Sequence, residues 1–244
     1  MVTIVIPIYN GAAFIADTVQ SVLNQSYNNW DLILSDDGST DEGLQIAEQT
    51  AKGRLRVLSY PTNTGVGAAL NRGIRVSDPT KPFIFTLGAD DLLAKDALLV
   101  LTDAIAGHGV ARGRAINIGS HTSLDEFHTL VESTTMPPPK PKWGPVMMQR
   151  SLFQHYGLLD ESLRHATDGE YWMRLFGPDY TRKDRATYTV VERVLLGRRL
   201  HPGQLLQTFK SYTPEQRQAE KEQMESLVRA RLIDPFSKGI TRLD

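Results

Sequence analysis

The sequence contains no cysteine among its 244 residues. This absence excludes disulfides, thiolate zinc sites and cysteine nucleophiles, and it favours a reducing compartment. No apolar run approaches the roughly 18 residues that a membrane-spanning helix needs. The short apolar run at residues 2–7 has no basic flank and is followed at once by polar residues, unlike a signal peptide. We therefore expect a soluble, cytoplasmic protein.

The chain also lacks an excess of either charge. Lys and Arg number 27 against 28 Asp and Glu, which argues against a disordered acidic chain or a uniformly basic nucleic-acid binder. The distribution is uneven, because residues 1–130 carry 9 basic and 14 acidic residues, whereas residues 131–244 carry 18 and 14. The two parts are therefore expected to differ in function.

Short apolar runs alternate with amphipathic stretches over the first 105 residues, a pattern typical of βαβ units in a mostly parallel sheet. Strands are expected at 2–6, 31–35, 54–59 and 82–87, and helices at 12–23, around 44–47 and at 65–74. Ser39 or Thr40 is a candidate cap for the second of these helices. Polar residues follow the strands, at the edge where open α/β sheets bind ligands.

The pattern is looser beyond residue 107. Strands are expected at 114–118, 146–148 and 187–196, and helices from Ser151, around residues 171–176 and at 214–232. The last helix is charged and carries an apolar stripe of Met224, Leu227, Val228 and Leu232, which suits docking on the core or a dimer seam. Residues 134–142, rich in proline, are expected to form an extended linker or surface flap.

Eight short motifs occur in an order that resembles the family 2 glycosyltransferases. They are IPIYN at 6–10, SDDGSTD at 35–41, NTG at 63–65, ALNRG at 69–73, LGADD at 87–91, GLLDE at 157–161, DGEYWMR at 168–174 and RLHPG at 199–203. The resemblance implies the α/β GT-A fold, a Rossmann-like, mostly parallel sheet flanked by helices. It implies a nucleotide-sugar-binding half at 1–105, an acceptor-binding and catalytic half at 106–205, and a C-terminal helical extension at 206–244.

A divalent metal is expected from the carboxylates that follow the fourth strand. Mg²⁺ and Mn²⁺ prefer hard oxygen ligands and can bridge the two phosphates of a donor. The resemblance implies that Asp91, Asp90 and His201 hold this metal, although Asp90 could instead cap a helix that starts near Ala94. The family usually has aspartate where this chain has Gly88, which leaves the ribose contact and the metal affinity open.

The resemblance also implies the residues that bind the donor nucleotide. They are Pro7, Tyr9, Asn10, Asp36, Asn63, Asp90 and Arg199. Asp36 would bind the base, commonly uracil, although a turn with a cap explains that segment too, and Pro7 could simply end its strand. Asn63 opens a segment that lacks the ending of a phosphate-binding P-loop.

Arginines are the candidates for pairing with the donor phosphates. Arg198 or Arg199 could pair with phosphate oxygens as a fork. Leu70 stands where the family usually has arginine. Arg72 could replace that arginine only by facing the cleft, and we expect it to be a surface residue.

Inverting transfer needs a carboxylate that takes the proton from the acceptor hydroxyl. The resemblance implies Asp168 for this role, at the start of the helix that carries Trp and Arg, although Asp168 could also cap that helix. Trp143, Glu170 and Trp172 are candidate acceptor contacts, and Trp143 could equally anchor the proline-rich segment.

The expected function is metal-assisted, inverting transfer of a sugar from a nucleotide-diphosphate donor, with a UDP-sugar favoured, to a glycan or lipid-linked acceptor. Two alternatives stay open. The basic second half could face a polyanion such as modified nucleic acid. The fold could instead serve as a non-catalytic sugar-nucleotide-binding scaffold, which the departures at Leu70, Gly88 and Thr167 would favour.

Overall fold

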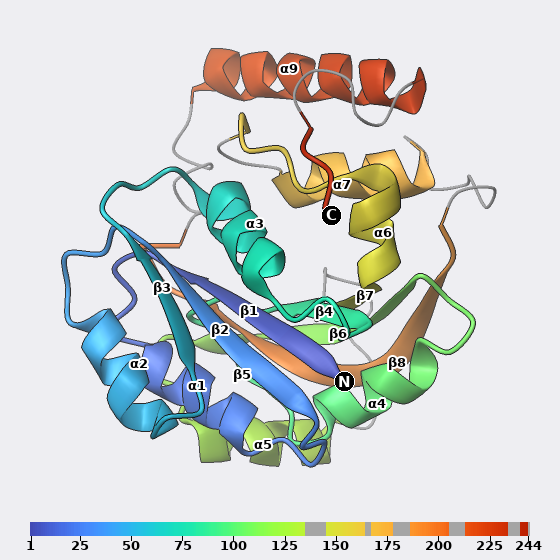
Figure 1. Cartoon of the computed structure of the whole chain (residues 1–244). Helices are drawn as coiled ribbons and strands as arrows, with labels where there is room; N and C mark the ends of the chain where they lie inside the picture. Colours follow the sequence, from blue (N-terminus) through green and yellow to red (C-terminus); the bar gives the residue numbers. More distant parts are fainter. Residues whose placement is uncertain (135–144, 164–166, 178–185, 205–212, 234–239, 244) are drawn as a thin grey trace.

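A computed structural model describes residues 1–134, 145–163, 167–177, 186–204, 213–233 and 240–243. A single sheet with strand order β3-β2-β1-β4-β7-β6-β8-β5 runs through the molecule, with helices on both of its faces (Figure 1). The helix α9 lies beyond α7 at one end of the molecule (Figure 1).

The first half of the chain forms parallel neighbours in the sheet. Its strands are β1 (Val2–Ile8), β2 (Trp30–Asp37), β3 (Arg56–Tyr60) and β4 (Phe83–Thr86), connected through α1 (Ile15–Leu23), α2 (Gly43–Ala51) and α3 (Val66–Val76). The pairs β1–β2, β2–β3 and β1–β4 are all parallel. The βαβ organisation expected from the sequence is therefore confirmed, with strand and helix ends shifted by a few residues.

The second half completes the sheet with mixed pairing. It adds β5 (Leu92–Leu93), α4 (Ala97–Ala104), β6 (Val110–Gly119), α5 (Leu124–Ser133), β7 (Val146–Gln149), α6 (Arg150–Tyr156), α7 (Thr167–Phe176), β8 (Tyr188–Leu200) and α9 (Pro214–Ile233). β7 is antiparallel to both β4 and β6, whereas β6 and β8 are parallel. β8 extends four residues beyond the predicted strand, so Arg198 and Arg199 belong to it.

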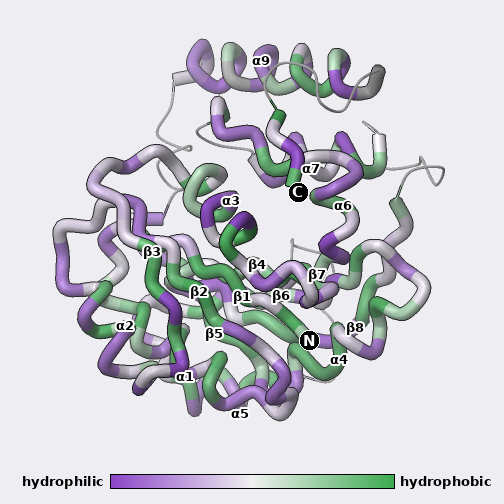
Figure 2. The backbone as a smooth tube through the Cα atoms, viewed as in Figure 1, coloured by the Kyte–Doolittle hydropathy of each residue, from purple (hydrophilic) through white to green (hydrophobic). Residues whose placement is uncertain are grey.

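Apolar side chains fill a layer on each face of the sheet, because successive residues of a strand point to opposite faces. Ile4 and Ile6 of β1 belong to the cluster beneath α1, α4 and α5, whereas Val5 packs with residues of α3, α6 and α7. Figure 2 shows the hydrophobic residues concentrated along the strands.

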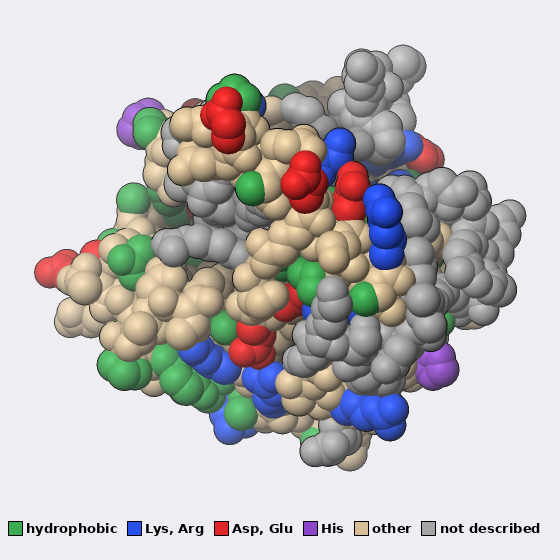
Figure 3. Space-filling model, turned by 90° about the horizontal axis from the view of Figure 1, so that it is seen from above, with side chains coloured by type: hydrophobic (Ala, Val, Ile, Leu, Met, Phe, Trp, Pro, Cys, Tyr) green, Lys and Arg blue, Asp and Glu red, His purple; other side chains and the backbone are tan. Residues whose placement is uncertain are grey.

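The C-terminal part packs on this frame. Leu227 and Val228 of α9 are buried, which confirms that part of its apolar stripe docks on the core. The backbone N–H of Leu158 donates to the Thr241 carbonyl (2.9 Å). Leu243 belongs to the apolar cluster that also contains buried residues of α3, α6 and α7. Hydrophilic residues recur along α9 (Figure 2), and acidic and basic side chains lie next to each other on the face seen from above (Figure 3).

The proline-rich segment predicted at 134–142 lies outside the described residues, apart from Thr134. No helix in the described ranges is long and apolar enough to cross a membrane.

Candidate functional site

The loops that follow β1 and β2 hold each other in place. The backbone N–H of Asn10 donates to Ser39 Oγ (3.0 Å), and Asn10 Oδ1 accepts from the backbone N–H of Thr40 (2.8 Å). Asn10 adopts a left-handed conformation with φ of 52°, which asparagine tolerates better than most residues. The prediction that Ser39 or Thr40 caps α2 is wrong, because that helix begins after Glu42 and has no side-chain cap.

Asp36 holds the turn after β2. Its side chain is buried, Oδ1 accepts from the backbone N–H of Ser39 (2.9 Å), and Oδ2 accepts from Ser59 Oγ (2.8 Å). The turn-forming alternative for this aspartate is therefore confirmed. Each carboxylate oxygen can accept a further hydrogen bond, so contact with a base stays a prediction.

Asp37 joins β2 to the loop after β3. It accepts from the backbone N–H groups of Thr64 (3.0 Å) and Gly65 (2.7 Å), and Arg72 Nη1 lies 2.8 Å from its Oδ1. The Arg72 guanidinium also lies 4.0 Å from the ring centroid of Tyr60. The expectation that Arg72 is a plain surface residue is wrong.

The other predicted nucleotide contacts lie around these loops. Pro7 lies within β1, which continues to Ile8, so the idea that it ends the strand is wrong. Tyr9 is 52% exposed, and Asn63 is exposed as well. Gly38 has φ of 82°, and a Cβ there would lie 3.1 Å from the Asn63 backbone nitrogen, which explains the glycine at this close approach.

Two carboxylates follow β4, as the sequence predicts. His201 Nε2 lies 3.0 Å from Asp90 Oδ2, and Asp91 Oδ1 accepts from the backbone N–H of Arg199 (3.2 Å). Burial, together with the negative charge of Asp90, raises the pKa of Asp91 to about 7. The helix-cap alternative for Asp90 is wrong, because α4 begins after Asp96.

Gly88 leaves the space into which this carboxylate pair extends. A Cβ at this position would lie 2.8 Å from Asp90 Oδ1 and 3.1 Å from Asp91 Oδ2. A larger residue at position 88 would therefore displace at least one carboxylate.

The carboxylate pair and His201 are chemically suited to a divalent cation. Carboxylate oxygens and an imidazole form a donor set that suits Mn²⁺, and a cation would offset both the burial and the Asp90 charge that raise the pKa of Asp91. The described residues contain no group of three or more acidic, histidine or cysteine side chains already arranged around one metal position. The residues therefore fit a metal, although their side chains are not assembled around one.

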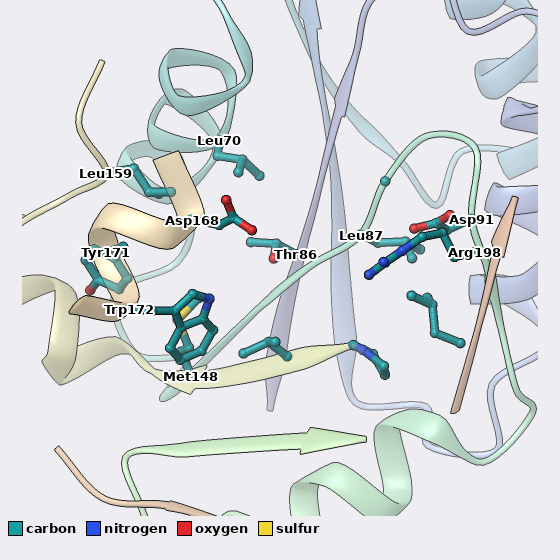
Figure 4. Close-up of a pocket in the computed structure, with 14 residues that line it drawn as sticks. Leu70, Thr86, Leu87, Asp91, Met148, Leu159, Asp168, Tyr171, Trp172 and Arg198 are labelled. Carbon is teal, nitrogen blue, oxygen red and sulfur yellow. The ribbon is translucent and has the colours of Figure 1, made fainter. Parts of the chain in front are cut away.

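Arg199 is buried, and its guanidinium is occupied by the protein. Nε donates to the Asp90 carbonyl (3.0 Å), and Nη1 donates to the carbonyls of Ser120 (3.0 Å) and Thr122 (2.8 Å). This geometry contradicts a phosphate-binding role for Arg199. Its neighbour Arg198 points to the other face of β8 and lines a pocket (Figure 4).

That pocket, of about 250 Å³, brings separate parts of the sequence together. Asp91 and Arg198 lie on one side of it, and Asp168 and Trp172 of α7 lie on the other (Figure 4). The remaining lining is mainly apolar and includes Leu70, Leu87, Val146, Met148, Leu159 and Leu196. The pocket therefore combines charged groups at two sides with an apolar surface between them.

Asp168 is exposed near the start of α7. The preceding Thr167 packs directly on α3, since a Cβ on Gly67 would approach Thr167 Cγ2 to 2.8 Å. The absence of a side chain on Gly67 thus lets the first turn of α7 lie close to α3.

The three candidate acceptor residues differ in where they lie relative to the pocket. Trp172 lines the pocket and stacks on Phe176, with 5.5 Å between ring centroids. Glu170 is fully buried between Arg174 and Arg231, so its prediction as an acceptor contact is wrong. Trp143 lies outside the described residues.

An open α/β sheet with polar loops at the carboxyl ends of its parallel strands defines a class of proteins that bind ligands at that edge. The chain belongs to glycosyl transferase family 2, whose sequence profile matches residues 3–169. The predicted family is confirmed.

Individual relatives of this chain are also described as glycosyltransferases. The putative teichuronic acid biosynthesis glycosyltransferase TuaG of Bacillus subtilis is 31% identical over 140 residues, which are 55% of this chain and 55% of that protein. The matches to the first three curated relatives cover 33% to 66% of their lengths.

Solved structures confirm the GT-A fold. S. aureus TarS 1–349 in complex with UDP-GlcNAc superposes with a TM-score of 0.70 at 16% identity, covering 98% of this chain and 73% of that one. The mannosyltransferase PcManGT from Pyrobaculum calidifontis, in complex with GDP-Man and Mn²⁺, gives a TM-score of 0.64 at 17% identity, covering 96% and 66%. At these identities the likeness shows the fold alone.

Proposed function

We propose that the chain transfers a sugar from a nucleoside-diphosphate donor to an acceptor hydroxyl, with inversion at the anomeric carbon. The observation that carries the proposal is the pocket in which Asp91 and Arg198 face Asp168. One side offers groups suited to a diphosphate, and the other offers a carboxylate suited to accept a proton.

The donor nucleotide would bind where the loops after β1, β2 and β3 meet. Tyr9 offers an exposed ring to the base, and the Asp36 turn and Asn63 lie in the adjoining loops. We favour a UDP-sugar, and the TarS complex with UDP-GlcNAc supports this choice for a protein of the same fold. Residues 1–105 would thus form the donor half, and residues 106–205 the acceptor and catalytic half.

A divalent cation, Mn²⁺ or Mg²⁺, would be held by Asp91, Asp90 and His201. When bound, it would neutralise the negative charge that develops on the leaving diphosphate. The Mn²⁺ in the PcManGT complex supports a metal in this fold. Arg198 would contribute a second positive charge on the same side of the pocket.

Asp168 would act as the general base. Its carboxylate takes the proton from the acceptor hydroxyl while the hydroxyl oxygen forms a bond to the anomeric carbon. The bond between that carbon and the phosphate oxygen breaks on the opposite side, and the nucleoside diphosphate leaves with the bonding electrons. The buried indole of Trp172 would offer an apolar surface beside the reacting sugar.

The acceptor is proposed to be a glycan or a lipid-linked sugar, and the name of TuaG supports a glycan. Burial of four of the 18 basic residues at 131–244 lowers the positive charge that this half can offer to a nucleic acid. Arg150, Arg174, Arg199 and Arg231, all in the basic second half, are buried inside the protein. They are therefore not available to the phosphates of a nucleic acid.

Isothermal titration with UDP and with GDP, each with and without Mn²⁺, tests the donor site. We expect Mn²⁺-dependent binding of UDP, its loss in Asp91→Asn, and its retention in Asp103→Asn, a matched change at an exposed aspartate of α4. Failure of the unmodified chain to bind either nucleotide would overturn the proposal. Binding without any turnover of UDP-sugars would favour the non-catalytic scaffold.

A further inference from the structure

The helix α7 presents different residues to the pocket and to the protein interior. Asp168 and Trp172 line the pocket, whereas Glu170 and Arg174 are fully buried. An α-helix turns about 100° per residue, so positions 168 and 170 point about 200° apart. The contact that fixes Glu170 therefore also fixes the direction of Asp168.

Glu170 belongs to a buried cluster of four charged side chains. Its Oε1 lies 3.0 Å from Arg174 Nε and 2.9 Å from Arg231 Nη1. Arg231 Nη2 lies 2.7 Å from Asp160 Oδ2. Glu170, Arg174 and Arg231 are 0% exposed, and Asp160 is 4% exposed. We call these four residues the ion cluster, in which two carboxylates balance two guanidinium groups.

The ion cluster joins segments that are far apart in the sequence. Glu170 and Arg174 come from α7, Asp160 from the segment between α6 and α7, and Arg231 from the last turns of α9. Arg174 Nη1 also donates to the carbonyl groups of Tyr156 (2.8 Å) and Leu158 (2.9 Å), at the end of α6. The cluster thus joins α9, α7 and the end of α6, and Figure 1 shows α9 and α7 side by side.

We propose that Arg231 is a positioning residue for the transfer reaction. By holding Glu170 on the interior side of α7, it keeps Asp168 directed into the pocket. This inference rests on the proposed role of Asp168 as the general base. It also gives the C-terminal helix, which lies beyond the residues that match the family profile, a function in the active site.

Arginine has a specific advantage at this position. Its planar guanidinium reaches Glu170 through Nη1 and Asp160 through Nη2 at the same time. A lysine ammonium is a compact charge on a flexible stem, so it would hold the two carboxylates less rigidly.

The test measures the direction of position 168 without any assay of activity. Because the chain has no cysteine, Asp168→Cys and Tyr9→Cys introduce two unique sites for nitroxide labels. Pulsed electron paramagnetic resonance then gives the distribution of distances between the labels. The doubly labelled chain is measured without further change. It is then measured with one added substitution, which is Arg231→Met, Arg231→Lys or Arg229→Met. Arg229 lies on the same helix with its side chain 80% exposed, and so provides the matched control.

We expect one narrow distribution in the parent and in Arg229→Met. In Arg231→Met the distribution should shift or become at least about twofold wider, because α7 loses the contact that orients it. Arg231→Lys should give an intermediate result, and it keeps the test valid if Arg231→Met does not fold. Unchanged distributions in both Arg231 variants would overturn the proposal. The UDP titration tests the proposed function separately, because a chain that binds no UDP still reports these distances.

Discussion

The proposed donor side, formed by the loops after β1, β2 and β3, and the proposed acceptor side, formed by α7, are held in place by different kinds of contact. On the donor side, short loops after neighbouring parallel strands bind one another, as in the contact of Asn10 with Ser39 and Thr40. On the acceptor side, α7 is oriented by charges buried beneath it, one of which comes from Arg231 in α9. The donor side is therefore specified by nearby strand ends, whereas the acceptor side depends on the C-terminal helix.

This difference predicts how much stability a substitution on each side removes. Loss of the exposed contact between Asn10 and Ser39 leaves the freed polar groups accessible to water, so its cost stays small. A lost charge in the ion cluster leaves another charge buried without compensation, which costs much more. Substitutions on the two sides should therefore differ in the size of their effect on stability. They should also differ in the property that they change.

The largest expected effect on stability is that of Glu170→Ala. It leaves two buried arginines with only Asp160 as an acidic partner, and the free energy of unfolding should fall by about 3–5 kcal/mol. Urea denaturation followed by circular dichroism measures the change. The control Glu132→Ala, at an exposed position of α5, should stay within about 0.5 kcal/mol of the parent. A loss as small as that of the control would show that the cluster contributes little.

On the donor side, Asp37→Asn should have a smaller effect. It removes the negative charge that pairs with Arg72 and weakens the anchor of the loop at Thr64 and Gly65, at a cost of about 1–3 kcal/mol. Affinity for UDP should fall with it, because this loop adjoins the proposed base site. Calorimetry of Asp37→Asn beside Asp103→Asn checks both effects, and equal UDP affinity in the two variants would contradict a link between this loop and the donor.

Gly88→Ala tests the space beneath the carboxylate pair. The added methyl group would lie 2.8 Å from Asp90 Oδ1, so the side chain must move. We expect Mn²⁺-dependent UDP affinity to fall about 3- to 10-fold, which corresponds to about 0.7–1.4 kcal/mol, with little change in stability. Gly119→Ala is the matched control, since its Cβ would make only an ordinary contact, 3.5 Å from Thr122 Oγ1. Unchanged affinity in Gly88→Ala would show that the position of these carboxylates does not matter for binding.

The smallest expected effect is that of Ser39→Ala. It removes one partly exposed hydrogen bond to the Asn10 backbone, so stability should fall by about 0.5–1 kcal/mol. Denaturation measurements should resolve this loss, and turnover should be nearly unchanged. A loss above that of Asp37→Asn would mean that the two loops depend on each other far more than their contacts indicate.

Sequence patterns predict the fold of residues 1–105 well because its signals are local. The strands β1, β2 and β4 each contain a short apolar run that leads into polar residues, and neighbouring strand ends meet at one edge. The helix α5 was missed, although Ser123 and Glu126 form a capping box that marks its start. The sequence therefore contains a local signal for the start of this helix.

The errors at Arg199 and Glu170 have physical causes that local patterns do not contain. Residues along a strand alternate between faces, so choosing Arg198 over Arg199 required knowing that β8 continues past residue 196 and on which face the pocket lies. Glu170 was misassigned because its partner Arg231 lies about sixty residues later, in a helix whose docking the motif pattern does not specify.

The central claim is that the two sides of one pocket bind the donor and activate the acceptor separately. The most direct measurement compares UDP affinity in Mn²⁺ with the rate of UDP release from UDP-sugars, in the parent, Asp91→Asn and Asp168→Asn. The account predicts that Asp91→Asn loses UDP binding, whereas Asp168→Asn binds UDP normally and turns over about 10²- to 10⁴-fold more slowly. An Asp168→Asn variant that keeps full turnover, or that loses UDP affinity as much as turnover, would contradict it.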